Sequence, residues 1–276
     1  MTTMPTPSRA VSRTAYGASV PASGMRHVPE EVPVAFSFHG TTHAVMMASP
    51  TDLEDFAIGF CLGDGIVTKA AEILEVDIVQ VDGGVDLQIT LATDQQAQLK
   101  TRRRHMAGPV GCGLCGVESI EDVLRPLPEI AAEGQSFTPR DIVDAVALLS
   151  QQQPMNQKTR AMHAAGFYIP GEGIVAVRED VGRHNALDKL AGHLARTGQA
   201  AREGAIVMTS RVSVELVQKA AIAGAPLLIA VSAPTALALD VAERAGITIA
   251  ALVRGDAFEL FTHPGRISAE RSSHVA

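Results

Sequence analysis

The feature that most constrains the fold is an alternation of short apolar segments and helical segments in the second half of the chain. Apolar stretches at 205–208, 227–231 and 247–253 are separated by segments with helical spacing at 214–223 and 236–245, and glycine follows each helical segment. Glycine commonly ends a helix, and continuous apolar strands between helices are typical of buried parallel sheets. The second half therefore predicts an α/β domain of largely parallel strands with helices on both faces.

The preceding stretch predicts two more helices and a hairpin in this half. The Thr-Pro-Arg-Asp run at 138–141 has the chemistry of a helix start, and the helix continues over 142–149. Apolar strands at 167–169 and 174–177 flank a Pro-Gly-Glu-Gly turn, and residues 183–196 have helical character. These elements complete the predicted second domain.

The first half shows a different pattern of two hairpins and one helix. Strands at 34–39 and 43–48 enclose a Gly-Thr-Thr turn, and strands at 75–81 and 85–92 enclose an Asp-Gly-Gly turn. Between the hairpins, the Ser-Pro-Thr-Asp run at 49–52 predicts a helix start with the serine as cap, followed by apolar residues at helical spacing. We therefore expect a small α+β domain.

These patterns divide the chain into four segments. Residues 1–29 contain three arginines and no acidic residue, a composition that resembles a transit peptide but fits a disordered tail better. Residues 30–125 form the predicted α+β domain, a proline-containing linker spans 126–137, and residues 138–276 form the predicted α/β domain. The fold class is thus α/β with two domains.

Composition and charge exclude several classes of protein. The chain is 46% hydrophobic, enough for a sizeable core, and its formal net charge of −7 argues against general nucleic-acid binding. No apolar run reaches the length of a membrane span, and the N-terminus lacks the apolar core of a signal peptide. Three cysteines are too few for a disulfide scaffold, so we expect a protein of the reducing cytoplasm.

The densest chemical signal is the run Gly-Cys-Gly-Leu-Cys-Gly at 111–116, which contains Cys112 and Cys115. Glycines beside both cysteines let the backbone turn tightly and leave the sulfurs accessible. The run Lys-Thr-Arg-Arg-Arg-His at 100–105 lies just upstream, and cations favour the nucleophilic thiolate. This pattern predicts sulfur chemistry on an anionic partner. The third cysteine, Cys61, lies on the first predicted helix and is expected to be a buried packing residue.

From the residues alone, four interpretations of the cysteine pair stay open. A zinc site needs four ligands, so this pair would have to be shared across a dimer or be completed by His105. A thioredoxin-like redox pair normally lies where a strand enters a helix, whereas this pair follows hairpins and a basic run. An inert structural role fits poorly with so much glycine, and carriage of sulfur as a persulfide is the fourth interpretation.

A second polar concentration lies at 178–185, with the sequence Arg-Glu-Asp-Val-Gly-Arg-His-Asn between a predicted strand and helix. It is either a charged loop with Asp180 as the helix cap or a ligand site in which His184 moves protons. Zinc deaminase chemistry is excluded, because Ala165 stands two residues after His163, where glutamate is needed, and the second half contains no cysteine.

Three polar turns follow the apolar strands of the second half, at 209–211, 232–235 and 254–256. Ligands of open α/β sheets bind beyond the carboxyl ends of strands, near helix N-termini. These turns offer hydroxyls, backbone amides and arginines, which suit phosphate groups. They are candidate binding residues, although any strand-to-helix turn has similar chemistry.

Together, the motifs closely resemble the FdhD family of formate dehydrogenase accessory sulfurtransferases. The resemblance rests on the run at 111–116, on Glu-Asp-Val-Gly-Arg-His-Asn-Ala-Leu-Asp-Lys at 179–189 and on Thr-Ser-Arg-Val-Ser-Val-Glu-Leu-Val-Gln-Lys at 209–219. Shorter matches extend it over about residues 30–268. The resemblance implies a homodimer and a second domain that resembles cytidine deaminases without their zinc site.

The resemblance also implies a sulfurtransferase that accepts sulfur from a cysteine desulfurase as a persulfide on Cys112, with Cys115 as the second thiol. The bound substrate is then the molybdenum or tungsten bis(pyranopterin guanine dinucleotide) cofactor, which the formate dehydrogenase catalytic subunit uses. No metal site and no permanently bound cofactor are expected. The implied cofactor-binding segment comprises Leu252, Val253, Arg254, Gly255, Asp256 and Ala257.

We therefore expect a cytoplasmic sulfurtransferase that binds neither nucleic acid nor membrane. Two rival functions stay open. One is a non-catalytic chaperone that binds the cofactor and uses the cysteines for a zinc ion shared across a dimer. The other is a thiol–disulfide oxidoreductase that cycles a Cys112–Cys115 disulfide.

Overall fold

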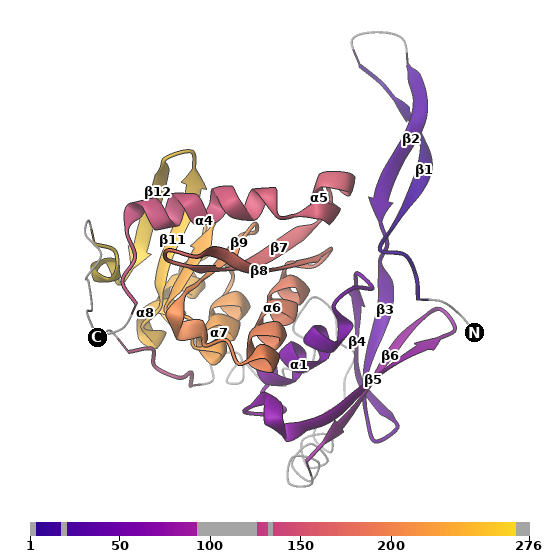
Figure 1. Ribbon diagram of the computed structural model, residues 1–276, viewed down its shortest axis with the longest axis horizontal. Helices are drawn as coiled ribbons and strands as arrows, with labels where there is room; N and C mark the ends of the chain where they lie inside the picture. Colours follow the sequence, from indigo (N-terminus) through magenta and orange to yellow (C-terminus); the bar gives the residue numbers. More distant parts are fainter. Residues whose placement is uncertain (1–3, 18–20, 93–125, 132–134, 269–276) are drawn as a thin grey trace.

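Two sheets and a projecting hairpin organise the described part of the chain (Figure 1). The structure is a computed structural model, and it describes residues 4–17, 21–92, 126–131 and 135–268. The cysteine run at 111–116 and the basic run before it lie outside these residues. What the sequence predicts for them therefore stays a prediction.

The larger sheet has six strands in the order β12-β11-β10-β9-β7-β8. Its strands are β7 (His163–Ile169), β8 (Gly173–Asp180), β9 (Ala205–Met208), β10 (Leu227–Ala230), β11 (Thr248–Arg254) and β12 (Ala257–Thr262). β9, β10 and β11 run parallel, as the alternation of strands and helices predicts. The sheet as a whole is mixed rather than largely parallel, because β7–β8 and β11–β12 are antiparallel hairpins at its two ends.

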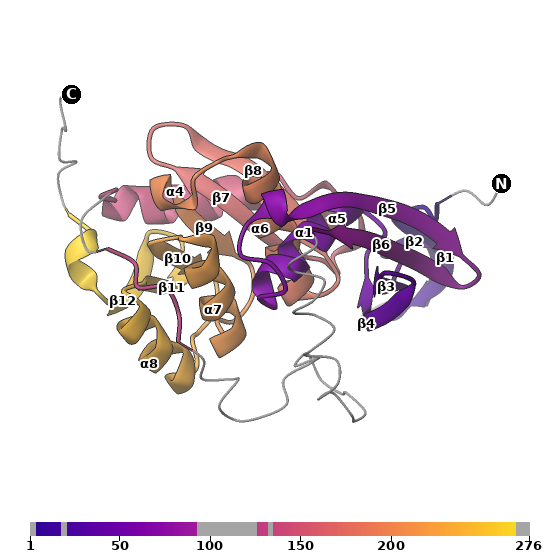
Figure 2. The same ribbon diagram turned by 90° about the horizontal axis from the view of Figure 1, so that it is seen from below.

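Helices cover both faces of this sheet and make three layers (Figure 2). They are α4 (Pro139–Gln151), α6 (Arg183–Thr197), α7 (Val214–Ala223) and α8 (Ala236–Ala245). Successive side chains of each strand point to opposite faces of the sheet. Ile206 and Leu228 pack with the core under α6, α7 and α8, whereas Val207 and Ile229 pack with Ile142 of α4. None of the described helices is long and apolar enough to cross a membrane.

The first domain contains a four-stranded sheet in the order β4-β3-β6-β5. Its elements are β3 (Val32–Phe38), β4 (Thr41–Ala48), α1 (Leu53–Gly63), β5 (Ile73–Val81) and β6 (Gly84–Leu91). Both predicted hairpins are thus confirmed. The ring of Phe36 stacks on Phe60 with centroids 4.0 Å apart and meets the edge of Phe56 at 5.0 Å, so α1 closes one face of the sheet.

The two domains meet where α1 packs against α6. Glycines make this contact unusually close. A Cβ atom at Gly59 would collide with the backbone oxygen of Asp188, and one at Gly192 would collide with the backbone oxygen of Asp55. Larger residues at either glycine would therefore force the helices apart.

The N-terminal segment is a correction to the expected disordered tail of residues 1–29. β1 (Ser8–Ala15) and β2 (Ala22–Pro29) pair antiparallel along their full length and form a hairpin, here called the arm, which projects from the first domain (Figure 1). No residue of either strand is buried, so hydrophobic alternation gives no signal for them. Arg26 Nη2 donates to the backbone oxygen of Thr159, in the short helix α5 (Pro154–Thr159), at 3.3 Å.

The described part of the expected linker, 126–137, packs against the α/β domain. The backbone N–H of Ile130 donates to the carbonyl of Ala245 at 2.8 Å. Phe137 is fully buried and pairs with Ile267 in a parallel bridge. These residues therefore belong to the C-terminal core.

Candidate functional site

Four strands of the larger sheet end on one edge, and three helices begin there. β7 is antiparallel to both β8 and β9, with His163 opposite Asp180 and Ala165 opposite Met208, so β8 and β9 end on the same edge. β10 and β11 are parallel to β9 and end there too. The helices α6, α7 and α8 follow β8, β9 and β10, which places their N-terminal amides at this edge. The sheet-edge site, as we call it, comprises residues 181–184, 209–213, 231–235 and 252–257.

The two central turns of the sheet-edge site are hydrogen-bonded to each other. The N–H of Val212 donates to the carbonyl of Ala233 at 3.2 Å, and the N–H of Thr235 donates to the carbonyl of Val212 at 3.0 Å. The hydroxyl of Thr209 accepts a hydrogen bond from the N–H of Ala164 at 2.9 Å. The structure therefore confirms that both predicted polar turns lie between a strand end and a helix start.

The third predicted turn, 254–256, lies at the same edge but does not lead into a helix. β11 continues through this turn into β12, so the turn is the tip of a hairpin. The pairing shifts register between Ala251 and Arg254, and Leu252 has a φ of 56°. A positive φ is costly for a branched residue, and such strain together with a bulge is frequent near functional sites.

The segment that the sequence predicts to bind the cofactor is mostly accessible. Arg254, Gly255, Asp256 and Ala257 are exposed, whereas Val253 is buried. The backbone is left-handed at Gly255, with a φ of 57°, and its surroundings are open. The hairpin tip therefore presents an arginine and a bare backbone to solvent.

His184 lies in another part of the sheet-edge site, and His163 lies beside the site at the start of β7. His184 Nε2 lies 3.4 Å from Ser213 Oγ and 3.8 Å from Glu215 Oε2. Burial, followed by the charge of Arg183, lowers the pKa of His184 to about 4, and the same two causes lower the pKa of His163. At pH 7 His184 is therefore a neutral hydrogen-bonding group, which does not favour the predicted proton shuttle.

The low pKa of His184 predicts a loss of stability in acid. Between about pH 6.5 and 4 an unfolded histidine is protonated while folded His184 is not, so the unfolded state binds more protons and the free energy of unfolding falls as the pH falls. Between pH 7 and pH 4, we expect the free energy of unfolding of H184Q to fall by roughly 2 to 3 kcal/mol less than that of the wild type. The measurement is urea unfolding across that pH range. An unaltered pH dependence of the free energy of unfolding in H184Q would contradict the assignment.

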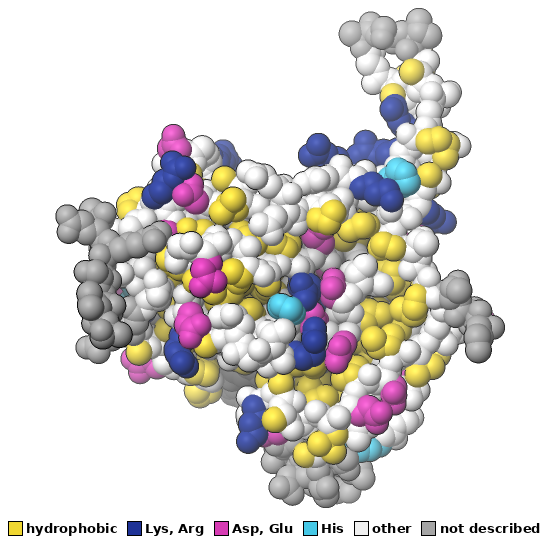
Figure 3. All heavy atoms as spheres, in the orientation of Figure 1, with side chains coloured by type: hydrophobic (Ala, Val, Ile, Leu, Met, Phe, Trp, Pro, Cys, Tyr) yellow, Lys and Arg dark blue, Asp and Glu magenta, His cyan; other side chains and the backbone are white. Residues whose placement is uncertain are grey.

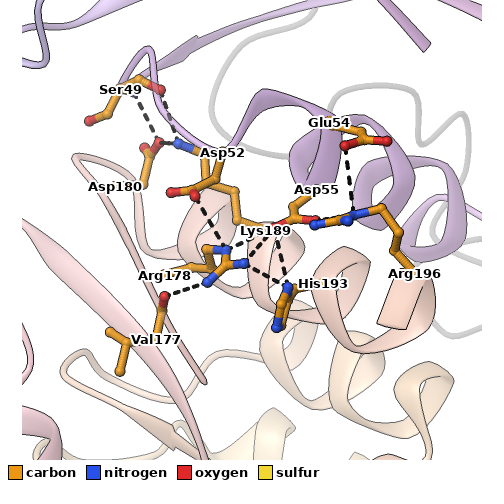
Figure 4. Close-up of polar contacts among 10 residues, drawn as sticks. All are labelled: Ser49, Asp52, Glu54, Asp55, Val177, Arg178, Asp180, Lys189, His193 and Arg196. Atoms are coloured by element: carbon orange, nitrogen blue, oxygen red, sulfur yellow. Dashed lines mark hydrogen bonds and ion pairs between the residues drawn. The ribbon is translucent and has the colours of Figure 1, made fainter. Parts of the chain in front are cut away.

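Asp180 is not the helix cap that one interpretation of 178–185 expects. Asp180 and Lys189 are fully buried, with Lys189 Nζ 2.7 Å from Asp180 Oδ2. The backbone N–H of Ser49 donates to Asp180 Oδ2 at 3.0 Å, and Lys189 Nζ donates to the carbonyl of Ser49 at 2.9 Å (Figure 4). Asn185 Nδ2 donates to Asp180 Oδ1 and to the carbonyl of Met47, each at 2.9 Å. We call Ser49, Asp180, Asn185 and Lys189 the buried clamp.

The clamp also explains why the predicted cap at Ser49 is wrong. α1 begins at Leu53, after Asp52 with a φ of 51°, and has no side-chain cap. At α6, Gly182 precedes the first helical residue. Capping patterns consider only neighbouring residues, whereas the hydroxyl of Ser49 accepts from the N–H of Val181 at 3.2 Å, in the other domain.

A second polar cluster joins the same domains (Figure 4). The buried carboxylate of Asp55 in α1 accepts from Arg178 Nη2 at 2.7 Å and from Arg196 Nε at 2.8 Å. Arg178 Nη2 also lies 2.7 Å from His193 Nδ1, and burial, followed by the charge of Arg178, lowers the pKa of His193. The run 178–189 and the rest of α6 therefore dock the first domain beside the sheet edge.

A cavity of about 710 Å³ between the domains shares no residue with the sheet-edge site. Its walls come from α1, the described linker, α6 and α7, and include Gly63, Asp188 and Lys219. Lys219 Nζ lies 2.6 Å from Asp188 Oδ1, and a side chain at Gly63 would crowd that lysine. Gly63 thus leaves room for the ion pair between Lys219 and Asp188 in the wall of the cavity.

The three cysteines fall into two groups. Cys61 is fully buried in α1, and burial raises the pKa of its thiol, which confirms the predicted packing role. Cys112 and Cys115 lie outside the described residues. Within the described ranges, no three His, Cys, Asp or Glu side chains are grouped as ligands of a metal ion would be.

Comparisons with known proteins match nearly the whole chain. The model of the FdhD/NarQ family matches residues 29–268. The sulfur carrier protein FdhD of Agrobacterium fabrum is 57% identical over 259 residues, which cover 94% of this chain and 96% of that protein. Its namesake from Brucella abortus is 56% identical over 260 residues, 94% of this chain and 97% of that protein. A crystal structure described as a formate dehydrogenase accessory protein from Desulfotalea psychrophila has the same fold, with a TM-score of 0.77 at 24% identity over 95% of this chain and 100% of that chain.

Proposed function

Because the chain belongs to the FdhD/NarQ family, we propose that it is a sulfur carrier that supplies sulfur for the activation of formate dehydrogenase. Support comes from family membership along nearly the whole chain and from the run Gly-Cys-Gly-Leu-Cys-Gly at 111–116. In this proposal Cys112 carries the sulfur as a persulfide, and Cys115 is a second thiol that assists it.

The proposed first step is a thiol exchange that loads Cys112. Its thiolate attacks the outer sulfur of a persulfide on a cysteine desulfurase. The S–S bond of the desulfurase persulfide breaks, a new S–S bond forms on Cys112, and the desulfurase cysteine leaves as a thiolate. The arginine run at 102–104 supports this step, because nearby cations favour the attacking thiolate.

We propose that the sheet-edge site holds the receiving substrate, the molybdenum or tungsten bis(pyranopterin guanine dinucleotide) cofactor. The exposed arginines Arg211 and Arg254 suit its pyrophosphates, since a guanidinium binds phosphate through paired hydrogen bonds. The N-termini of α6, α7 and α8 add backbone donors and positive partial charge at the same edge. The formate dehydrogenase catalytic subunit is the proposed recipient of the sulfurated cofactor.

The observation that carries this proposal is the cysteine run within a chain of this family. The test is mass spectrometry of the full-length protein and its peptides after incubation with a cysteine desulfurase and cysteine. We expect a gain of one sulfur atom, removable by reductant, on the peptide that contains Cys112. Unmodified or zinc-bound thiols would contradict the proposal and favour the chaperone, and a Cys112–Cys115 disulfide without added sulfur would favour the oxidoreductase.

A further inference from the structure

The cavity between the two domains has the size and the walls of a small-molecule site. Its volume is about 710 Å³, within the range of about 300–1,000 Å³ that is typical of such sites. Small or apolar side chains form most of its wall and include Leu62, Ile130, Ala191, Leu194, Ala195 and Ile222. By contrast, charged side chains of both signs gather over the contact between α1 and α6 on the outer face of the molecule (Figure 3). The cavity therefore suits an uncharged, largely apolar ligand.

One buried carboxylate oxygen in this wall lacks a partner. Asp188 is 1% exposed, and its Oδ1 accepts from Lys219 Nζ at 2.6 Å. Its Oδ2 is buried and has no hydrogen-bond partner among the residues that the structure describes. Such an acceptor is destabilising, because it has lost its water and gained no donor in return. Burial accordingly raises the pKa of Asp188, while the charge of Lys219 acts in the opposite direction.

The pair of Asp188 and Lys219 is separate from the sheet-edge site. The two long sequence runs that contain these residues, 179–189 and 209–219, both begin at that edge. A helix rises about 1.5 Å per residue, so Asp188 and Lys219 lie roughly 8 Å further along α6 and α7. A Cβ atom at Gly63 would lie 2.7 Å from Lys219 Nζ and 3.1 Å from Asp188 Oδ1. The absence of a side chain at Gly63 thus keeps this polar part of the wall open.

The ion pair also determines the charge of a fitting ligand. A cation at Asp188 Oδ2 would lie near Lys219 and be repelled, and an anion would be repelled by the carboxylate itself. Arg266, another residue of the wall, already donates to the carbonyls of Pro226, Gly246 and Ala131. The other charged residues of the wall are exposed and balance in sign: Lys69, Glu129, Arg202 and Glu203. An uncharged donor therefore satisfies the carboxylate without burying a second charge.

We propose that the interdomain cavity binds a small, uncharged aromatic molecule that donates one N–H or O–H hydrogen bond to Asp188 Oδ2. The apolar walls hold the ring, and the carboxylate orients it. An aromatic ring gives a large apolar contact at a low cost in conformational entropy. This ligand site goes beyond the proposed function, because it involves neither the cysteines nor the sheet-edge site.

Indole and benzofuran are matched probes of this site, because benzofuran has an oxygen in place of the N–H of indole. The chain contains no Trp, so the fluorescence of added indole reports its binding to the full-length protein. We expect a dissociation constant of about 1 mM or below for indole. Benzofuran, measured by competition with indole, should bind at least about 10-fold more weakly, since it leaves Asp188 Oδ2 without a donor.

Two variants locate the bound probe. In D188N the amide oxygen faces Lys219 and the amide nitrogen replaces Oδ2, so indole should weaken to about the level of benzofuran. A195F fills the cavity without changing the ion pair, and it should weaken both probes at least about 10-fold. A147F adds the same side chain at an exposed position of α4 outside the cavity, and it should leave both dissociation constants unchanged.

Separate outcomes overturn the inference. It fails if indole does not bind at concentrations up to about 10 mM, or if benzofuran binds as tightly as indole. It also fails if A195F binds indole as tightly as the wild type does, a comparison that stands even where D188N does not fold. Persulfide formation on Cys112 is a separate measurement, so failure here would leave the proposed function untouched.

Discussion

Replacement of Cys112 by alanine is expected to abolish maturation of formate dehydrogenase, with residual activity below about 1% of wild type, because in the proposed function Cys112 holds the sulfur as a persulfide. C61A should leave maturation near normal, since Cys61 is fully buried and burial raises the pKa of its thiol. The measurement is formate dehydrogenase activity in cells whose own copy of the gene is replaced by each variant.

The cysteine variants also separate the roles of the two thiols. If Cys115 only assists, C115A keeps the added sulfur on Cys112 in mass spectrometry but lowers maturation. C61A is the matched control, because it removes a thiol from the same chain without touching the run at 111–116. A dead C61A together with an active C112A would show that the sulfur site has been misassigned.

Local sequence patterns are sufficient to predict much of the fold. The alternation of apolar strands and helices identified the parallel core of the larger sheet, and both hairpins of the first domain appear where their turns predict. The predicted start of α4 is confirmed, since Asp141 N–H donates to Thr138 Oγ1 at 3.2 Å and Asp141 Oδ2 accepts from Thr138 N–H at 2.8 Å. Each of these features depends on residues within a few positions of one another.

The elements that were missed have no such local signal. The arm buries no side chain, so its strands lack the alternation on which strand prediction depends. The strand β12 was missed because its residues, Ala257–Thr262, follow a polar turn of the kind that elsewhere precedes a helix. Only the pairing of β12 with β11, which the structure shows and the local sequence does not, distinguishes a strand from a helix after this turn.

The same limit applies to the candidate site. Spacing placed polar turns beyond the strand ends, and the structure confirms two of them as strand-to-helix turns. The sequence could not show that Asp180 and Lys189 face the backbone of Ser49, some 130 residues away. A run rich in Asp, Arg, His and Lys suggested a ligand site or a solvated loop, whereas much of it is a buried domain contact.

The buried clamp provides the second large expected effect. K189M removes the lysine that pairs with Asp180 while keeping most of the side-chain volume, so the carboxylate stays buried without this cation. Removing one partner of a buried ion pair typically costs about 3–5 kcal/mol, and we expect a decrease of that size in the free energy of unfolding from urea titration. Because the clamp joins the turn before α1 to the turn before α6, the first domain should also lose its fixed position beside the sheet edge.

Two further variants isolate the cause of that loss. In K189M/D180N the buried charge is gone, and we expect about half of the lost stability to return, since the asparagine can still accept from the backbone of Ser49. R140M breaks the exposed pair between Arg140 and Asp144 and should cost less than about 1 kcal/mol. If K189M cost no more than R140M, the clamp would not hold the domains together. If the double variant were no more stable than K189M, lost packing rather than an uncompensated charge would be the cause.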